Sequence, residues 1–422
     1  MSDDAPVNFV EATDWESLPA EEAVAGFINR ALDQRASDLF LLAEEGSYTV
    51  AMRRFGICTN VLTVSAETGR RWLNHVKTMA GMDLARRMHP NDGRWVGEFG
   101  DRVRVDLKIN TIPTLHGEDL DLRLLDASMH MVAPNDLGFD EKNFGELTSL
   151  ISRPSGLVLV TGPTGAGKTT TLYSCLHNLN DGRRKINKIE DPVEYVLPGV
   201  RQSQVNPRIE LDFPDLLRSI LRQSPDIIMI GEIRDPVTAQ TAIRAANSGH
   251  LVFATLHAPV STNAVDAMFA LGAMPYFLAN CLIGVVSQWL VRTLCVRCKK
   301  EYEFPGPPET FADVRKYLSQ DEGGKIYSAG GCTSCAGEGY AGRAAVVEVL
   351  RVSDEIRGMI LRRRGAKEIR RKAIQLGMMD LRQSALLKIA RGETSLEEVM
   401  RVVPAEYMEM SVEPEKGVCG EA

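Results

Sequence analysis

Short apolar runs alternate with amphipathic helical stretches in the middle of the chain. Three of these runs are "LVLV" at 157–160, "DIIMI" at 226–230 and "LVFAT" at 251–255. Because they lack the polar alternation of a half-exposed strand, they are typical of strands buried on both faces of a parallel sheet. Strands separated by helical stretches predict a doubly wound α/β domain, which we assign to residues 146–291.

A smaller domain with a different pattern precedes it. "AEEAVAGFINRALDQRASDLFLL" predicts an amphipathic helix running into a strand, and "YTVAMRRFG" continues as a second strand. "ETGRRWLNHVKTMAGM" predicts a helix that ends at Gly81, and "RWVGEF", "RVRVDLKIN" and "DLDLRLL" show strand-like alternation. We therefore predict an α+β domain over residues 17–145, preceded by a loose acidic tail over 1–16.

The C-terminal third divides into a cysteine- and glycine-rich segment at 292–345, helical stretches at 346–405 and a loose tail at 406–422. The preceding stretch at 267–291 carries no charge and is long enough to cross a bilayer. Four residues interrupt it, so we expect a buried pair of core helices rather than a membrane span. They are Pro275, Asn280, Ser287 and Gln288.

Composition limits the class of protein only weakly. The 422 residues are 44% hydrophobic and 25% charged, with a net charge of −7 and a pI near 5.7. The chain as a whole therefore has no basic field for nucleic acid, which makes such a partner unexpected. The acidic N-terminus lacks an apolar leader, and we expect a cytoplasmic location.

The run "GPTGAGKTT" between a predicted buried strand and a predicted helix matches a phosphate-binding loop. Glycines let backbone N–H groups wrap a phosphate, and the following helix adds its positive N-terminal end. Lys168 is expected to reach the β- and γ-phosphates, and the Thr169 hydroxyl to hold Mg²⁺. The expected nucleotide contacts in this loop are Gly162, Pro163, Thr164, Gly165, Ala166, Gly167, Lys168, Thr169 and Thr170.

Acidic side chains follow two of the other strands. Glu232 comes directly after "DIIMI" and Gly231, which puts a carboxylate at the sheet edge where such folds bind ligands. We expect Glu232 to orient or deprotonate an attacking water, directly or through the Mg²⁺ shell. In "KIEDPVEY", Glu190, Asp191 and Glu194 are expected to face the same pocket.

Two histidines, His250 and His257, bracket the "LVFAT" strand in "GHLVFATLH". A single histidine is usually structural, but two that flank one inner strand beside the phosphate site could sense the state of a nucleotide. We therefore predict a sensing role for this pair.

Four of the eight cysteines form two short pairs, Cys295 with Cys298 and Cys332 with Cys335. Each Cys-x-x-Cys knuckle presents two thiolates, and two knuckles complete a closed tetrahedral zinc site. Because a closed site leaves no open position, we expect structural Zn²⁺. Cys58, Cys175, Cys281 and Cys419 fit no ligand pattern and are interpreted as ordinary residues.

Taken together, "GPTGAGKTTTLY", "IEDPVEYVLPGVRQSQVNP", "LLRSILRQSPDIIMIGEIRDPVTAQTAIRAANSGHLVFATLH" and the four cysteines resemble the secretion-superfamily ATPases. These are cytoplasmic motors of type II secretion and type IV pilus assembly, and the resemblance covers about residues 20–405. It implies a homohexameric ring with a small PAS-like N-terminal domain, a RecA-like ATPase domain, a zinc insert and a C-terminal helical subdomain. It also implies an inner-membrane platform protein as partner and a peripheral association with that membrane.

The resemblance assigns roles to individual residues. Lys168 and Thr169 would bind ATP·Mg²⁺, and Glu194 and Glu232 would support hydrolysis. Other residues are implied as nucleotide contacts, some from a neighbouring subunit: Arg218, Arg222, Arg94 and His257. An arginine that arrives only when subunits close would couple the geometry of the ring to stabilisation of the transition state.

The chain also departs from the family pattern. "KINT" at 108–111 stands where the family has Arg-Val-Ser-Thr, and Lys108 cannot form the bidentate fork of an arginine. "HAPVS" lacks the usual Thr-Asn-Asp after the second histidine. Because of these changes, a first alternative function is a nucleotide-gated scaffold, which would bind ATP but hydrolyse little of it.

A second alternative is a nucleic-acid motor, because "LRRRGAKEIRRK" at 361–372 is basic. Binding to single-stranded DNA that weakens steeply with salt is the property that would distinguish it. The simpler interpretation of this run is the solvated face of a helix.

Overall fold

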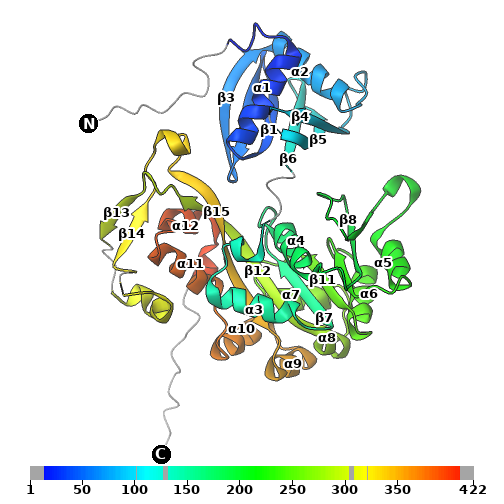
Figure 1. Ribbon diagram of the computed structural model, residues 1–422, viewed down its shortest axis with the longest axis vertical. Helices are drawn as coiled ribbons and strands as arrows, with labels where there is room; N and C mark the ends of the chain where they lie inside the picture. The colour runs from blue at the N-terminus through cyan, green and yellow to red at the C-terminus, as the bar shows by residue number, and fades with distance from the viewer. Residues whose placement is uncertain (1–13, 101, 127–131, 304–307, 321, 409–422) are drawn as a thin grey trace, which may run out of the picture. The chain divides into compact units, whose positions relative to one another are not determined.

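The computed structural model describes residues 14–100, 102–126, 132–303, 308–320 and 322–408 (Figure 1). These residues belong to two compact units that divide between Met131 and Val132. The expected domain boundary at residue 145 falls inside helix α3 (Glu141–Ile151), which packs in the core of the second unit. Most of the two predicted tails, together with Cys419, lies outside the described residues.

The N-terminal unit is an antiparallel sheet covered by two helices. Its six strands run in the order β3-β2-β1-β6-β5-β4, and both helices pack on β1, which places them on the same face of the sheet. This agrees with the predicted α+β class. The elements are α1 (Ala20–Asp33), β1 (Ala36–Glu44), β2 (Ser47–Arg54), β3 (Ile57–Ser65), α2 (Ala66–Met79), β4 (Asn91–Phe99), β5 (Arg102–Pro113) and β6 (Glu118–Asp126).

Alternation along the strands builds the core of this unit. On β5, Val105, Leu107 and Ile109 are buried and pack against the helices through residues such as Phe27 and Trp72. Because side chains alternate between faces along a strand, these three residues share the covered face. Strand β3 is not among the predicted strands, because most of its side chains are partly or fully exposed and it lacks a clear apolar alternation.

One ion pair lies within this apolar core. The Lys77 ammonium donates to Oε1 of Glu118 at 2.7 Å, and the two side chains are 1% and 8% exposed. Two charges removed from water are tolerated only when each neutralises the other. The pair therefore ties helix α2 to the start of β6.

The second unit is a seven-stranded sheet with helices on both faces (Figure 1). Its order is β15-β12-β7-β11-β10-β8-β9, and all pairs are parallel except β15 with β12. This confirms the predicted α/β fold class. The strands are β7 (Gly156–Thr161), β8 (Ile186–Glu190), β9 (Arg201–Gln204), β10 (Ile227–Ile230), β11 (Leu251–Leu256), β12 (Leu282–Leu294) and β15 (Tyr340–Arg351).

Two apolar clusters fill the two sides of this sheet. Leu157 and Leu159 of β7 belong to one cluster, and Val158 and Val160 belong to the other. A strand with both faces covered has no polar alternation, which explains the continuous apolar runs. The helices of the sheet region are α3, α4 (Lys168–Leu179), α5 (Phe213–Leu221), α6 (Pro236–Asn247), α7 (Asn263–Ala270) and α8 (Pro275–Cys281), with 3₁₀ turns at Pro134–Asp136 and Pro207–Ile209.

The prediction of a helix pair over 267–291 is correct for the first part of this stretch and wrong for the second. Helices α7 and α8 occupy its first part, but the residues from Leu282 onward form β12, which pairs in parallel with β7. Apolar periodicity alone cannot separate a buried strand from a buried helix segment. Among the described residues, no helix is both long enough and apolar enough to span a membrane.

The cysteine-rich segment is an insertion between β12 and β15. It contains a small sheet of β13 (Lys300–Glu303) and β14 (Lys325–Ser328), with 3₁₀ segments at Pro308–Tyr317 and Thr333–Cys335. After β15 the chain is helical, as predicted. The helices are α9 (Asp354–Leu361), α10 (Ala366–Gln375), α11 (Leu381–Ala390), α12 (Leu396–Val402) and α13 (Ala405–Met408).

Replacing Glu118 with Gln tests the buried ion pair. The change leaves the Lys77 ammonium buried without a counter-charge, so we expect a loss of about 3–5 kcal/mol in unfolding free energy. Urea unfolding followed by tryptophan fluorescence measures it, because three of the four tryptophans (Trp15, Trp72 and Trp95) lie in this unit. The exposed Glu45→Gln is the control and should change the free energy by about 0.5 kcal/mol or less. Equal effects of the two changes would contradict this account.

Candidate functional site

Three neighbouring parallel strands end at the same edge of the large sheet. Strand β7 ends at Thr161, β11 at Leu256 and β10 at Ile230, and β11 lies between the other two. The residues that follow these strands are the glycine-rich loop, His257 and Glu232. Since the carboxyl edge of parallel strands is where open α/β sheets bind ligands, these residues form the candidate site.

The loop between β7 and α4 has a backbone that requires glycine. Gly162, Gly165 and Gly167 have φ angles of 138°, 77° and 84°, a region that side chains rarely adopt. A Cβ on Gly162 would also collide with the carbonyl oxygen of Gln288 on β12. Gly167 is the N-cap of α4, so the loop leads directly into the positive end of a helix.

Lys168, the first residue of α4, folds back over this loop. Its ammonium donates to the carbonyl oxygens of Gly162 at 2.8 Å and Pro163 at 3.0 Å. Burial lowers the pKa of Lys168, and the negative charge of Glu232 acts in the opposite direction. The ammonium is thus held against the loop, which is where a terminal phosphate needs a cation.

Gln288 supports the loop from behind, and sequence reasoning missed it. Its side chain is 1% exposed; Nε2 donates to the Ala166 carbonyl at 2.5 Å and Oε1 accepts from the Thr171 hydroxyl at 2.8 Å. Because Ser287 pairs with Thr161, the last residue of β7, Gln288 lies beside the start of the loop. Its position depends on the pairing of β12 with β7, which no local motif indicates.

Glu232 is held between two basic side chains, His257 and Arg234. Its Oε1 lies 2.9 Å from Nε2 of His257, and its Oε2 lies 2.5 Å from Nη2 of Arg234. The Glu232 side chain is 16% exposed, against 55% for His257 and 63% for Arg234. Contacts to both of its oxygens therefore fix the orientation of the Glu232 carboxylate. A group that orients a reacting molecule needs such a fixed position.

The two histidines predicted to act together lie at opposite ends of β11. His250 precedes the strand, and its Nδ1 lies 2.9 Å from the Ala245 carbonyl. The six residues of β11 separate it from His257 by about 20 Å. The structure thus places only His257 beside Glu232, so His250 does not share its environment.

Glu190, the first residue of the acidic stretch, does not face the site. Glu190 points into the core, where the Tyr173 hydroxyl donates to both of its oxygens at 2.7 and 2.8 Å and Lys188 Nζ lies 2.6 Å away. Burial raises the pKa of Glu190, and the Lys188 ammonium opposes this effect. Glu190 therefore joins α4 to β8, which corrects the expectation that it lines the pocket. Lys188 and Glu190 stand two residues apart on one strand, a signal that the sequence already contained.

The predicted arginines lie on exposed surfaces. Arg218 forms an ion pair with Asp215 on its own helix and is 54% exposed, and Arg222 is the exposed C-cap of α5. Arg94 lies on β4 of the N-terminal unit, where Nε donates to Asp106 at 2.8 Å and this hydrogen bond raises the pKa of the arginine. Lys108 of β5 is the direct cross-strand neighbour of Arg94.

The four paired cysteines converge in the insertion between β12 and β15. All four Sγ atoms lie within 4.8 Å of one another, and three of the separations are 3.9, 3.7 and 3.7 Å. A tetrahedral zinc with Zn–S bonds of about 2.3 Å needs sulfur separations of about 3.8 Å. The backbone N–H groups of Cys332 and Gly339 also donate to Sγ of Cys335, which favours a thiolate. The cluster fits the predicted structural zinc site.

Zinc analysis tests this centre. We expect purified protein to contain about one equivalent of zinc, as a site of four thiolates holds a single tetrahedral ion. Replacing Cys332 and Cys335 with Ser should remove the metal and lower the melting temperature, because metal binding contributes to folding. Cys58→Ser, at an exposed cysteine outside the cluster, is the matched control. Elemental analysis measures the metal, and an unchanged content in the double variant would contradict the assignment.

Comparisons of sequence agree with this arrangement. Residues 13–401 match the family described as "Type II/IV secretion system protein". The chain is 38% identical over 402 residues to the type II secretion system ATPase E of Vibrio cholerae, covering 95% of this chain and 79% of that protein. It is 40% identical over 381 residues to the type IV pilus assembly ATPase PilB of Thermus thermophilus, covering 90% of this chain but 42% of that protein.

Solved structures show the same fold. The Yersinia pseudotuberculosis ATPase DotB matches with a TM-score of 0.67 at 19% identity, covering 92% of this chain and 94% of that one. The pilus retraction motor PilT with bound ADP matches with a TM-score of 0.60 at 25% identity, covering 89% and 96%. The matched length, the glycine-rich loop with Glu232 at its edge and the four-cysteine cluster lead to one conclusion: the chain belongs to the type II/IV secretion system protein family.

Proposed function

We propose that this protein hydrolyses ATP to ADP and phosphate and uses the energy to drive assembly of a type II secretion pseudopilus or a type IV pilus. The observation that carries the proposal is the Lys168 ammonium bound to the phosphate loop, with Glu232 following a nearby strand at the same edge of the sheet. The names of the relatives support the same function, because they describe ATPases of type II secretion and pilus assembly.

The chemistry follows from the residues at the sheet edge. Backbone N–H groups of the loop and the N-terminus of α4 would bind the phosphates, and Lys168 would exchange its two carbonyl partners for phosphate oxygens. The Thr169 hydroxyl would hold Mg²⁺, which supplies charge neutralisation between the phosphates. Glu232, aimed by His257 and Arg234, would orient the attacking water.

Residues of neighbouring subunits would complete the site in a homohexamer. Arg218 and Arg222 are exposed on one helix, so both are available to a second copy of the chain. Arg94 would bring positive charge from the N-terminal unit, whereas its cross-strand neighbour Lys108 cannot form the bidentate fork of an arginine. Glu194 would support hydrolysis together with Glu232.

The motion would pass to an inner-membrane platform protein, with the ATPase on the cytoplasmic side and the zinc centre bracing a surface of the motor. The exposed basic residues from Arg362 to Arg364 lie between α9 and α10. One of them, Arg364, pairs with Glu368 at 3.6 Å, and both side chains are 53% exposed, as on a solvated surface. A nucleic-acid motor is therefore the weaker alternative.

Two substitutions separate nucleotide binding from hydrolysis. Lys168→Ala should lower ATP turnover about 10²-fold or more, because it removes a cation that meets the charge developing on the phosphates. Glu232→Gln should lower turnover while binding of a fluorescent nucleotide persists. Lys367→Ala, at an exposed lysine of α10, is the control and should behave as the unmodified protein. Phosphate release by the assembled ring measures turnover, and unchanged turnover in Lys168→Ala would refute the site.

A further inference from the structure

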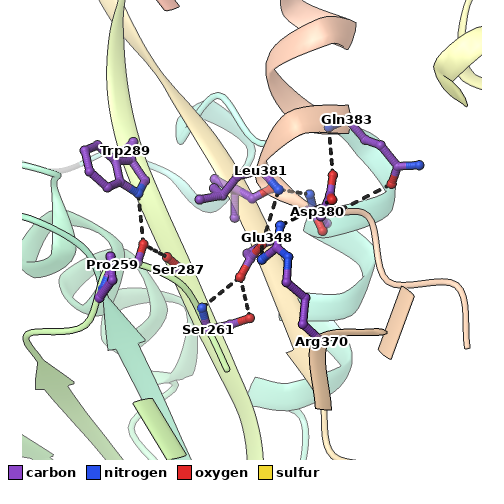
Figure 2. A network of polar contacts seen from close by, with 11 residues as sticks. Pro259, Ser261, Ser287, Trp289, Glu348, Arg370, Asp380, Leu381 and Gln383 are labelled. Carbon is purple, nitrogen blue, oxygen red and sulfur yellow. Dashed lines mark hydrogen bonds and ion pairs between the residues drawn. The ribbon is translucent and has the colours of Figure 1, made fainter. Parts of the chain in front are cut away.

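The segment that follows β11 begins at the candidate site and ends in the interior of the unit. We call residues 257–262 the histidine loop. Its first residue, His257, contacts Glu232, whereas Ser261 and Thr262 are 0% and 1% exposed. A loop that carries an exposed histidine to a reacting group must itself be held in place, and Figure 2 shows how.

The first anchor is strand β12. The Pro259 carbonyl accepts hydrogen bonds from the Ser287 hydroxyl at 3.1 Å and from Nε1 of Trp289 at 3.0 Å (Figure 2). Ser287 and Trp289 point to the same side of β12 because they stand two residues apart, whereas Gln288 points to the other side and supports the phosphate loop. Three successive residues of β12 thus hold both loops of the site.

The second anchor is Glu348 on β15, which pairs directly with Ser287 in the sheet. The Glu348 side chain is 0% exposed. Its Oε1 accepts from the backbone N–H of Ser261 at 2.7 Å and from the Ser261 hydroxyl at 2.6 Å. Figure 2 shows these bonds at the inner end of the histidine loop.

The other oxygen of Glu348 is held by the C-terminal helices. Its Oε2 accepts from Nη1 of Arg370 on α10 at 2.9 Å and from the backbone N–H of Leu381 on α11 at 3.2 Å. Arg370 also pairs with Asp380, the N-cap of α11, at 3.2 Å. A buried carboxylate with all these donors can take only one orientation without losing hydrogen bonds. The position of Ser261 is therefore set by helices that lie outside the nucleotide loops.

We propose that Ser287, Trp289 and Glu348 are positioning residues for ATP hydrolysis, holding the histidine loop so that His257 meets Glu232. The inference rests on the proposed function. It assigns to β12, β15 and the C-terminal helices an influence on turnover, although none of the three side chains touches Glu232 or the phosphate loop through a hydrogen bond seen in the described residues. The influence acts through His257.

Three variants of the full chain test the anchors. Ser261→Ala removes one bond to Glu348, Trp289→Phe removes one bond to Pro259, and Glu348→Gln replaces the carboxylate. We expect kcat to fall about 10-fold, because small misplacements of a site are costly, while nucleotide affinity stays within about twofold. Gln288→Leu is the contrast and should weaken nucleotide binding, because it releases the phosphate loop. Melting temperatures identify any variant that does not fold. If Glu348→Gln does not fold, the results for Ser261→Ala and Trp289→Phe decide the test.

A double-mutant cycle separates positioning from general support of the structure. In a His257→Ala background, Ser261→Ala and Trp289→Phe should lower kcat no further, because the residue through which they act is gone. An unchanged kcat in all folded single variants would overturn the inference. So would a parallel loss of nucleotide affinity, or full additivity with His257→Ala. Unmodified protein measured in the same assay distinguishes these results from a failure of the proposed function, in which it would show no turnover.

Discussion

The contact between the phosphate loop and β12 is the constraint on which the rest of the site depends. The loop passes so close to the Gln288 carbonyl that Gly162 has no room for a side chain, and the Gln288 amide then joins the Ala166 carbonyl to Thr171 on α4. Because interiors are close-packed, the loop cannot shift without moving the strand behind it. The same strand holds Pro259 from its other face. The phosphate loop and the histidine loop are therefore both held by the same strand, β12.

Buried charges fix the elements around that strand. Glu190 joins β8 to α4 through Tyr173 and is paired with Lys188 of its own strand, and Glu348 joins the histidine loop to the C-terminal helices. Such groups are costly to bury, and they are tolerated only where their partners are in place. Each therefore selects a single arrangement of its neighbours more strictly than apolar packing does. This property suits a protein whose reacting groups come from three different strands.

The cysteine centre lies at the end of the same strand. β12 ends at Leu294, and Cys295 is the next residue, while β15 begins shortly after Cys335. A zinc ion held by the four thiolates would close the base of the insertion. The long antiparallel pair of β12 and β15 would then be tied at one end by metal and at the other by the sheet. The phosphate loop, the histidine loop and the cysteine centre are thus all supported by strand β12.

The amino-acid sequence by itself determined the features that depend on local geometry. These are the phosphate loop, the carboxylate after a buried strand, the paired cysteines, and both domain classes. The first three are short runs whose chemistry is complete within a few residues, and the domain classes follow from the periodicity of successive short segments. Tertiary structure alone decided that residues from Leu282 form a strand, that Glu190 turns inward, that His250 lies far from His257, and that Gln288 and Glu348 hold the loops. The reason is physical: these outcomes follow from the order and register in which strands pair, and that pairing joins residues far apart in the chain.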